Sequence, residues 1–111
     1  MKDDKLYLIH IAECIERIES YTIQGQEAFK KSSMAQDAVA RNFEIIGEAV
    51  KRISQTLKQK HPDVPWQRIA GLRDVLIHDY ISVDLDEVWS IVQQNVPPFK
   101  KKLETILRDT A

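Results

Sequence analysis

The sequence predicts an all-α fold, a compact up-and-down bundle of about five helices. Apolar residues recur at three- and four-residue steps along most of the chain, as on the buried face of a helix. No segment shows the alternation of apolar and polar residues that is typical of a strand. Neither an internal repeat nor a linker divides the chain, so we expect residues 1–111 to form a single domain with one core.

Composition limits the classes of partner and compartment. Sixteen Lys and Arg residues against seventeen Asp and Glu residues give a formal net charge of −1, so any contact with nucleic acid must come from a local patch. The single cysteine, Cys14, cannot form an internal disulfide and fits a reducing cytoplasm. No apolar run approaches the ~20 residues of a membrane span, and the N-terminus is charged and amphipathic, unlike a signal peptide. These observations predict a cytoplasmic protein with no membrane partner.

The first predicted helix covers residues 4–24, and Asp3 or Asp4 is expected to cap its start. Within it, Cys14 is interpreted as a small buried side chain and His10 as a surface or hydrogen-bonded residue without a catalytic role. Five residues form the predicted inward stripe: Leu8, Ile11, Ile15, Ile18 and Thr22.

The second predicted helix is the longest, over residues 34–60. Ser33 and Gln36 have the spacing of a capping box and mark its start. Six apolar residues step by three or four along it and predict a continuous seam against an antiparallel neighbour: Val39, Phe43, Ile46, Val50, Ile53 and Leu57.

Prolines and capping residues place the remaining helices. After Pro62, a third helix is expected from residue 65 or 66 to residue 78. Asp84 and Glu87 have capping-box spacing and open a fourth helix. The pair Pro97-Pro98 is expected to end the fourth helix and to start a fifth.

The third helix contains the candidate site residues Arg73, His78 and Tyr80. On an ideal helix, Arg73 and Tyr80 nearly eclipse each other, whereas His78 points ~140° away from Arg73. One helix therefore cannot bring the three side chains to one point. Either the helix ends near His78, or a second copy of the chain completes the site.

Arginine, histidine and tyrosine together suit phosphoryl chemistry on RNA. A neutral imidazole can accept the proton of a ribose 2′-hydroxyl, and a guanidinium can stabilise the phosphate oxygens in the transition state. RNA carries its own nucleophile, so this chemistry requires no metal and no cofactor. The histidines at 10, 61 and 78 show no metal-ligand spacing. By themselves, however, these residues also permit structural roles, such as pairing of Arg73 with Asp74, Asp79 or a glutamate.

Two stretches together resemble the HEPN superfamily, specifically its HepT toxin branch. The first is Trp66–Asp74 followed by His78-Asp79-Tyr80, and the second is Arg41–Ala49. The family motif consists of arginine, a polar residue, three further residues, histidine, one residue and tyrosine. It matches here at Arg73, Asp74, His78 and Tyr80, and the similarity covers nearly the whole chain.

The resemblance implies a metal-independent endoribonuclease toxin that acts as a homodimer in a toxin–antitoxin pair. Arg73 and His78 would be catalytic, with contributions from both protomers meeting across a two-fold axis, and Asp74 and Asp79 would support them. The implied antitoxin is an MntA-like minimal nucleotidyltransferase. It would inactivate the toxin by transferring AMP to Tyr80.

Two other classes of function stay open at this point. The chain could be a non-enzymatic binding subunit of a minimal nucleotidyltransferase, in which Arg73 holds phosphate and His78 is structural. It could also be a purely structural dimer module. An intact Arg-His pair favours the ribonuclease over both alternatives.

Overall fold

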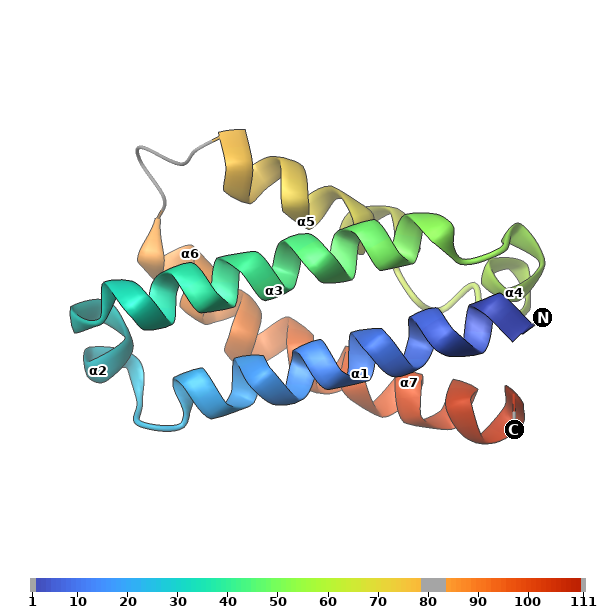
Figure 1. The fold of residues 1–111 in the computed structure, drawn as a ribbon, viewed down its shortest axis with the longest axis horizontal. Helices are drawn as coiled ribbons and strands as arrows, with labels where there is room; N and C mark the ends of the chain where they lie inside the picture. The colour runs from blue at the N-terminus through green and yellow to red at the C-terminus, as the bar shows by residue number, and fades with distance from the viewer. Residues whose placement is uncertain (1, 79–83, 111) are drawn as a thin grey trace.

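A computed structural model describes the backbone of residues 2–78 and 84–110, and the side chains of residues 3–72 and 84–110. Within these ranges the chain is helical, and the predicted all-α bundle is confirmed (Figure 1). The long helical segments alternate in direction, and two short helices join them. In chain order, the elements are α1 (Lys2–Thr22), α2 (Gln26–Lys31), α3 (Ser33–Arg52), α4 (Gln55–Lys60), α5 (Trp66–His78), α6 (Leu85–Ser90), the π-helical segment η1 (Ile91–Asn95) and α7 (Val96–Thr110).

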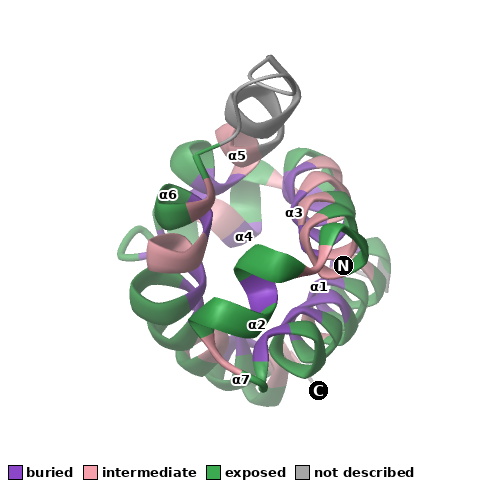
Figure 2. Ribbon diagram, turned by 90° about the vertical axis from the view of Figure 1, so that its left-hand side faces the viewer, coloured by how far each residue is buried: buried purple, intermediate pink, exposed green. Residues whose placement is uncertain are grey.

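The buried apolar residues form one hydrophobic core, to which α1, α3, α5 and α7 all contribute; α3 packs against both α1 and α5, and α7 packs against α1. Figure 2 shows the buried residues on the inner faces of the helices and the exposed ones outside. The predicted stripes of the first two long helices are confirmed. Their buried members are Leu8, Ile11, Ile15, Ile18 and Thr22 on α1, and Val39, Phe43, Ile46 and Val50 on α3.

The prediction of one helix over residues 34–60 is wrong, because the chain breaks between α3 and α4. Ile53 adopts an extended backbone conformation (φ −70°, ψ 140°), and the Ser54 hydroxyl caps α4 by accepting a hydrogen bond from the Leu57 N–H at 3.2 Å. Both Ile53 and Leu57 are still buried. The apolar spacing therefore continues across a break that it does not reveal.

Asp4 holds this break in place, contrary to its predicted role as the cap of the first helix. It lies inside α1 and is only 2% exposed. Its carboxylate accepts the Ser54 N–H at 2.9 Å and the Ser54 hydroxyl at 2.6 Å. The first helix is thus tied to the start of α4 across 50 residues of sequence.

Replacing Asp4 with alanine is expected to destabilise the protein by about 1–3 kcal/mol, because two donors of Ser54 would lose their acceptor in a largely buried site. Urea unfolding followed by circular dichroism measures this change. Asp3→Ala is the matched control, since Asp3 is exposed and contributes only through the helix dipole, about 0.3–1 kcal/mol. Equal effects of the two substitutions would contradict the role assigned to Asp4.

The helix α2 was not predicted, and the start of α3 differs from prediction by one residue. Gly25 (φ 99°) occupies a backbone region that favours glycine and allows the turn into α2. The N-cap of α3 is Ser32, whose hydroxyl accepts the Ala35 N–H at 3.1 Å, and not Ser33. Gln36 instead donates to the carbonyls of Phe29 and Lys30, both at 3.0 Å, and so closes the last turn of α2.

Side chains of α2 attach it to α6. Phe29 is 1% exposed, and its ring lies 5.7 Å from that of Trp89. Lys30 forms an ion pair with Asp86, next to the N-cap of α6. The predicted cap at Asp84 is confirmed, because its carboxylate accepts the N–H groups of Asp86 and Glu87 at 3.0 and 3.2 Å.

The predicted break at Pro97-Pro98 is absent, and α6, η1 and α7 form one continuous helical segment. The N–H of Val96 donates to the carbonyl of Ile91, five residues earlier, which defines the π register. Both prolines follow in the first turn of α7, where a missing N–H is tolerated. A π-helical turn thus carries the chain into α7 at the point where an interruption was expected.

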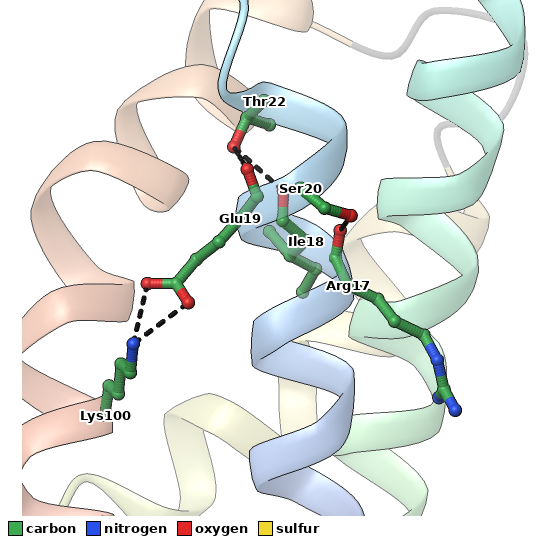
Figure 3. A network of polar contacts seen from close by, with 6 residues as sticks. All are labelled: Arg17, Ile18, Glu19, Ser20, Thr22 and Lys100. Carbon is green, nitrogen blue, oxygen red and sulfur yellow. Dashed lines mark hydrogen bonds and ion pairs between the residues drawn. The ribbon is translucent and has the colours of Figure 1, made fainter.

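An exposed ion pair ties α1 to α7 (Figure 3). The Lys100 ammonium lies 3.0 Å from both carboxylate oxygens of Glu19, and this hydrogen bond raises the pKa of Lys100. Figure 3 also shows the Thr22 hydroxyl donating to the Ile18 carbonyl at the end of α1. No helix in the described ranges has the length and apolar character needed to cross a bilayer.

Candidate active site

The helix α5 carries the predicted catalytic residues, and the segment before it fixes where it starts. The indole N–H of Trp66 donates to the His61 carbonyl at 3.0 Å, and the Ile69 N–H donates to the Pro65 carbonyl at 3.0 Å. Trp66 and Ile69 are buried, and Leu72 is half-buried. These apolar contacts position α5 along α3, with the two helices running in opposite directions (Figure 1).

Arg73, Asp74 and His78 lie on the backbone of α5, whose last residue is His78. Their side chains lie outside the described residues, as do Asp79 and Tyr80 as a whole. On an ideal helix, positions 73 and 78 are separated by a rise of ~7.5 Å and a rotation of ~140°. The structure thus places Arg73, Asp74 and His78 on one helix, α5.

The helix α3, which runs antiparallel to α5 (Figure 1), carries the second stretch singled out in the sequence. Arg41 forms an ion pair with Glu44 at 3.4 Å, and Arg41 is mainly exposed. Asn42 is 6% exposed, and its side-chain amide donates to the Ala38 carbonyl at 2.8 Å. Its side-chain oxygen has no hydrogen-bond partner among the described residues. The second stretch singled out in the sequence thus supplies exposed charges and a buried amide to the helix that packs against α5.

The structure also describes His10 and Cys14, the histidine and the cysteine of α1. His10 is exposed on α1, as predicted. Cys14 is fully buried, and burial raises the pKa of its thiol, which lowers the fraction of reactive thiolate. Among the residues with described side chains, no three His, Cys, Asp or Glu residues cluster as metal ligands would.

A pocket of about 420 Å³ opens beside the N-terminal half of α5, between that helix and the α6–η1–α7 segment. We call it the α5/η1 pocket. Its floor is apolar, and its rim is polar. The floor includes Phe43, Ile69, Leu72, Ile91 and Phe99, and the rim includes Arg68, Glu87, Gln94, Asn95 and Lys102.

The residues of this pocket form no recognisable motif in the sequence. Its rim joins Arg68 of α5 to Gln94 and Asn95 of η1, which are far apart in the chain. The only local signal is the polar run Gln93-Gln94-Asn95 directly before two prolines, in a segment otherwise patterned as an amphipathic helix. That signal does not show that the run faces α5.

Comparison with known proteins decides the family. A family model described as "Ribonuclease HepT-like" matches residues 11–106. The chain belongs to the HepT-like ribonuclease family. This result confirms the resemblance drawn from the motif around Arg73 and His78 and from the stretch on α3. No solved structure matches the chain significantly.

Three relatives show the range of HepT-like similarity. A probable ribonuclease HepT of Thermococcus cleftensis is 42% identical, over 95% of this chain and 96% of the relative. An mRNA nuclease HepT of Shewanella oneidensis is 25% identical, over 86% of this chain and 90% of the relative. A protein of Methanocaldococcus jannaschii named gamma-glutamylcyclotransferase and putative RNase is 41% identical over 97% of this chain, which spans about half (49%) of that relative's length.

Proposed function

We propose that this HepT-like protein is a metal-independent endoribonuclease toxin of a type II-like toxin–antitoxin pair. The observation that carries the proposal is the family match over residues 11–106, which includes the whole Arg73–Tyr80 motif. Relatives that align over nearly the entire chain are named as ribonucleases, so the similarity is not confined to one helix.

In the proposed reaction, His78 removes the proton from a ribose 2′-hydroxyl. The 2′-oxygen attacks the adjacent phosphorus, the bond from phosphorus to the 5′-oxygen breaks, and the leaving oxygen takes a proton from water. The products are a 2′,3′-cyclic phosphate and a 5′-hydroxyl. Arg73 stabilises the charge that develops on the phosphoryl oxygens, and Asp74 and Asp79 support the orientation of Arg73 and His78.

The proposal includes a homodimer, and the geometry of α5 supports it. Arg73 and His78 lie ~140° apart around one helix, so a single α5 cannot direct both at the same phosphate. A second copy related by a two-fold axis would place one protomer's arginine opposite its partner's histidine. Light scattering at low concentration should therefore give the mass of a dimer, whereas a stable, fully active monomer would contradict this part of the proposal.

Cleavage in the absence of metal tests the reaction. We expect the purified protein to cut single-stranded RNA equally well with and without excess EDTA, because the nucleophile belongs to the substrate. Mass spectrometry of the fragments should show 2′,3′-cyclic phosphate termini. Loss of cleavage in EDTA, or 5′-phosphate products, would contradict the mechanism. Tight RNA binding without cleavage would instead favour the non-enzymatic binding subunit.

Tyr80 is proposed as the control point at which an MntA-like nucleotidyltransferase adds AMP. A phosphate-linked nucleotide two residues from His78 would repel and occlude the substrate phosphate. We expect Tyr80→Phe to cleave RNA at nearly the wild-type rate and to resist inactivation by that enzyme and ATP. Tyr21→Phe is the matched control, because Tyr21 is exposed on α1 and should leave inactivation intact. Full inactivation of the Tyr80→Phe variant by the nucleotidyltransferase would show that Tyr80 is not the residue through which the protein is inactivated.

A further inference from the structure

The α5/η1 pocket has the form of a ligand site and plays no part in the proposed reaction. Its volume of about 420 Å³ falls within the range of ~300–1,000 Å³ typical of small-molecule sites. It combines an apolar floor with a few polar side chains, which is the usual composition of such sites. Ile69 and Leu72 of α5 and residues of α3 line it together, so the pocket lies alongside the contact between these two helices.

The rim of the pocket is built for hydrogen bonding to a flat polar group. Gln94 and Asn95 are exposed, and each carries both a donor and an acceptor in one amide plane. Pro98 has no N–H, so the Gln94 carbonyl also lacks the donor that four-residue helical pairing would supply. Amide side chains of this kind pair with the edges of nucleobases.

Charges around the pocket favour a neutral ring inside it and a phosphate outside. Arg68 is exposed and forms no ion pair within the described residues. Lys102 is already engaged by Asp63, whose carbonyl it contacts at 2.7 Å and whose carboxylate it approaches at 3.8 Å. Glu87 brings a negative charge to the same rim and would repel a phosphate placed in the pocket. Arg68 is thus the cation available to an adjoining phosphate.

We propose that the α5/η1 pocket binds one unstacked base of the RNA strand that the protein cleaves. The inference rests on the proposed ribonuclease function and adds a specificity subsite to it. The base lies on the apolar floor, its edge meets Gln94 and Asn95, and its phosphate meets Arg68. Unstacked bases are the parts of single-stranded RNA that proteins read in this way. Arg68 and His78 are ~15 Å apart along the axis of α5, so one strand can contact both regions.

Binding of an RNA that cannot be cleaved tests this proposal independently of catalysis. The probe is a fluorescently labelled RNA hexamer with a 2′-O-methyl group at every position, compared with hexamers in which each base in turn is removed. We expect removal of one particular base to weaken binding to the wild-type protein by roughly 5- to 150-fold, the range of a base held against a protein surface. Removal of the other bases should have smaller effects.

Two variants assign that base to the pocket. Gln94→Ala removes a rim amide and should weaken binding of the intact hexamer about 2- to 10-fold. It should have no further effect on the hexamer that lacks the critical base. Gln93→Ala is the matched control, since Gln93 is an exposed neighbour in η1 that does not line the pocket. Ile91→Trp should fill the pocket and abolish the preference for the critical base, with thermal unfolding confirming that the variant is folded.

Equal affinity of Gln94→Ala and wild type for the intact hexamer, together with no critical base, would overturn the proposal. The proposal would also be overturned if Ile91→Trp altered the oligomeric state of the protein but not its affinity for RNA. That result would show that a second copy of the chain covers the pocket. Cleavage is measured separately on unmodified RNA. A protein that binds through the pocket but does not cleave would contradict the ribonuclease proposal and leave the subsite intact.

Discussion

His78→Ala is expected to lower kcat/KM for RNA cleavage by about 10²- to 10⁴-fold, the usual contribution of a general base. Without the imidazole, the 2′-hydroxyl must lose its proton to water in the step that forms the bond to phosphorus. Arg73 would still stabilise the phosphoryl oxygens, so RNA binding should fall much less than turnover. The measurement is the initial rate of cleavage of a labelled oligonucleotide over a range of substrate concentrations.

Two other histidines provide matched controls for this experiment. His10 is exposed on α1, and His61 contributes a backbone carbonyl to Trp66, which alanine retains. His10→Ala and His61→Ala should therefore keep wild-type activity within about twofold. If His78→Ala were equally active, His78 would not be the base and the binding-subunit alternative would gain support. A loss shared by all three variants would indicate a folding defect.

Phe29→Ala is expected to destabilise the protein by about 3–5 kcal/mol, the cost of truncating a fully buried phenylalanine. The substitution would remove the aromatic contact with Trp89 and leave a cavity between α2 and α6. Since a domain of this size has a total stability of about 5–15 kcal/mol, the variant should unfold at a clearly lower urea concentration.

Met34→Ala is the control for that loss, because Met34 lies close in sequence to Phe29 but is 81% exposed. Its effect should be within about 0.5 kcal/mol of zero. A Phe29→Ala protein as stable as Met34→Ala would mean that α2 contributes little to the folded state. Retention of catalytic activity by folded Phe29→Ala at low temperature would show that this contact acts on stability alone.

The sequence by itself determined the class of fold, the family and the inward faces of the long helices. Apolar residues that recur every three or four positions indicate the buried face of a helix, and this spacing can be read from a short segment of sequence. Leu8, Ile11 and Ile15 were assigned to the core in this way, and all three are buried. The Asp84 cap was equally local, since donor and acceptor lie within three residues. The candidate site residues Arg73 and His78 also came from the sequence, through a motif of fixed spacing.

Tertiary structure decided the features that depend on partners far along the chain. The apolar seam of the second predicted helix continues past Ile53, so it does not reveal the break between α3 and α4. At that break, Ser54 donates a hydrogen bond to Asp4, which lies 50 residues away in the sequence. Packing of Phe29 on Trp89 likewise accompanies α2, a helix of six residues that is too short to be stable on its own. The α5/η1 pocket exists because residues of α5 and η1, far apart in the chain, line the same space. The periodicity of apolar residues shows which side of a helix is buried. The stability of a helix break, a short helix or a pocket depends instead on residues from elsewhere in the chain that pack against it.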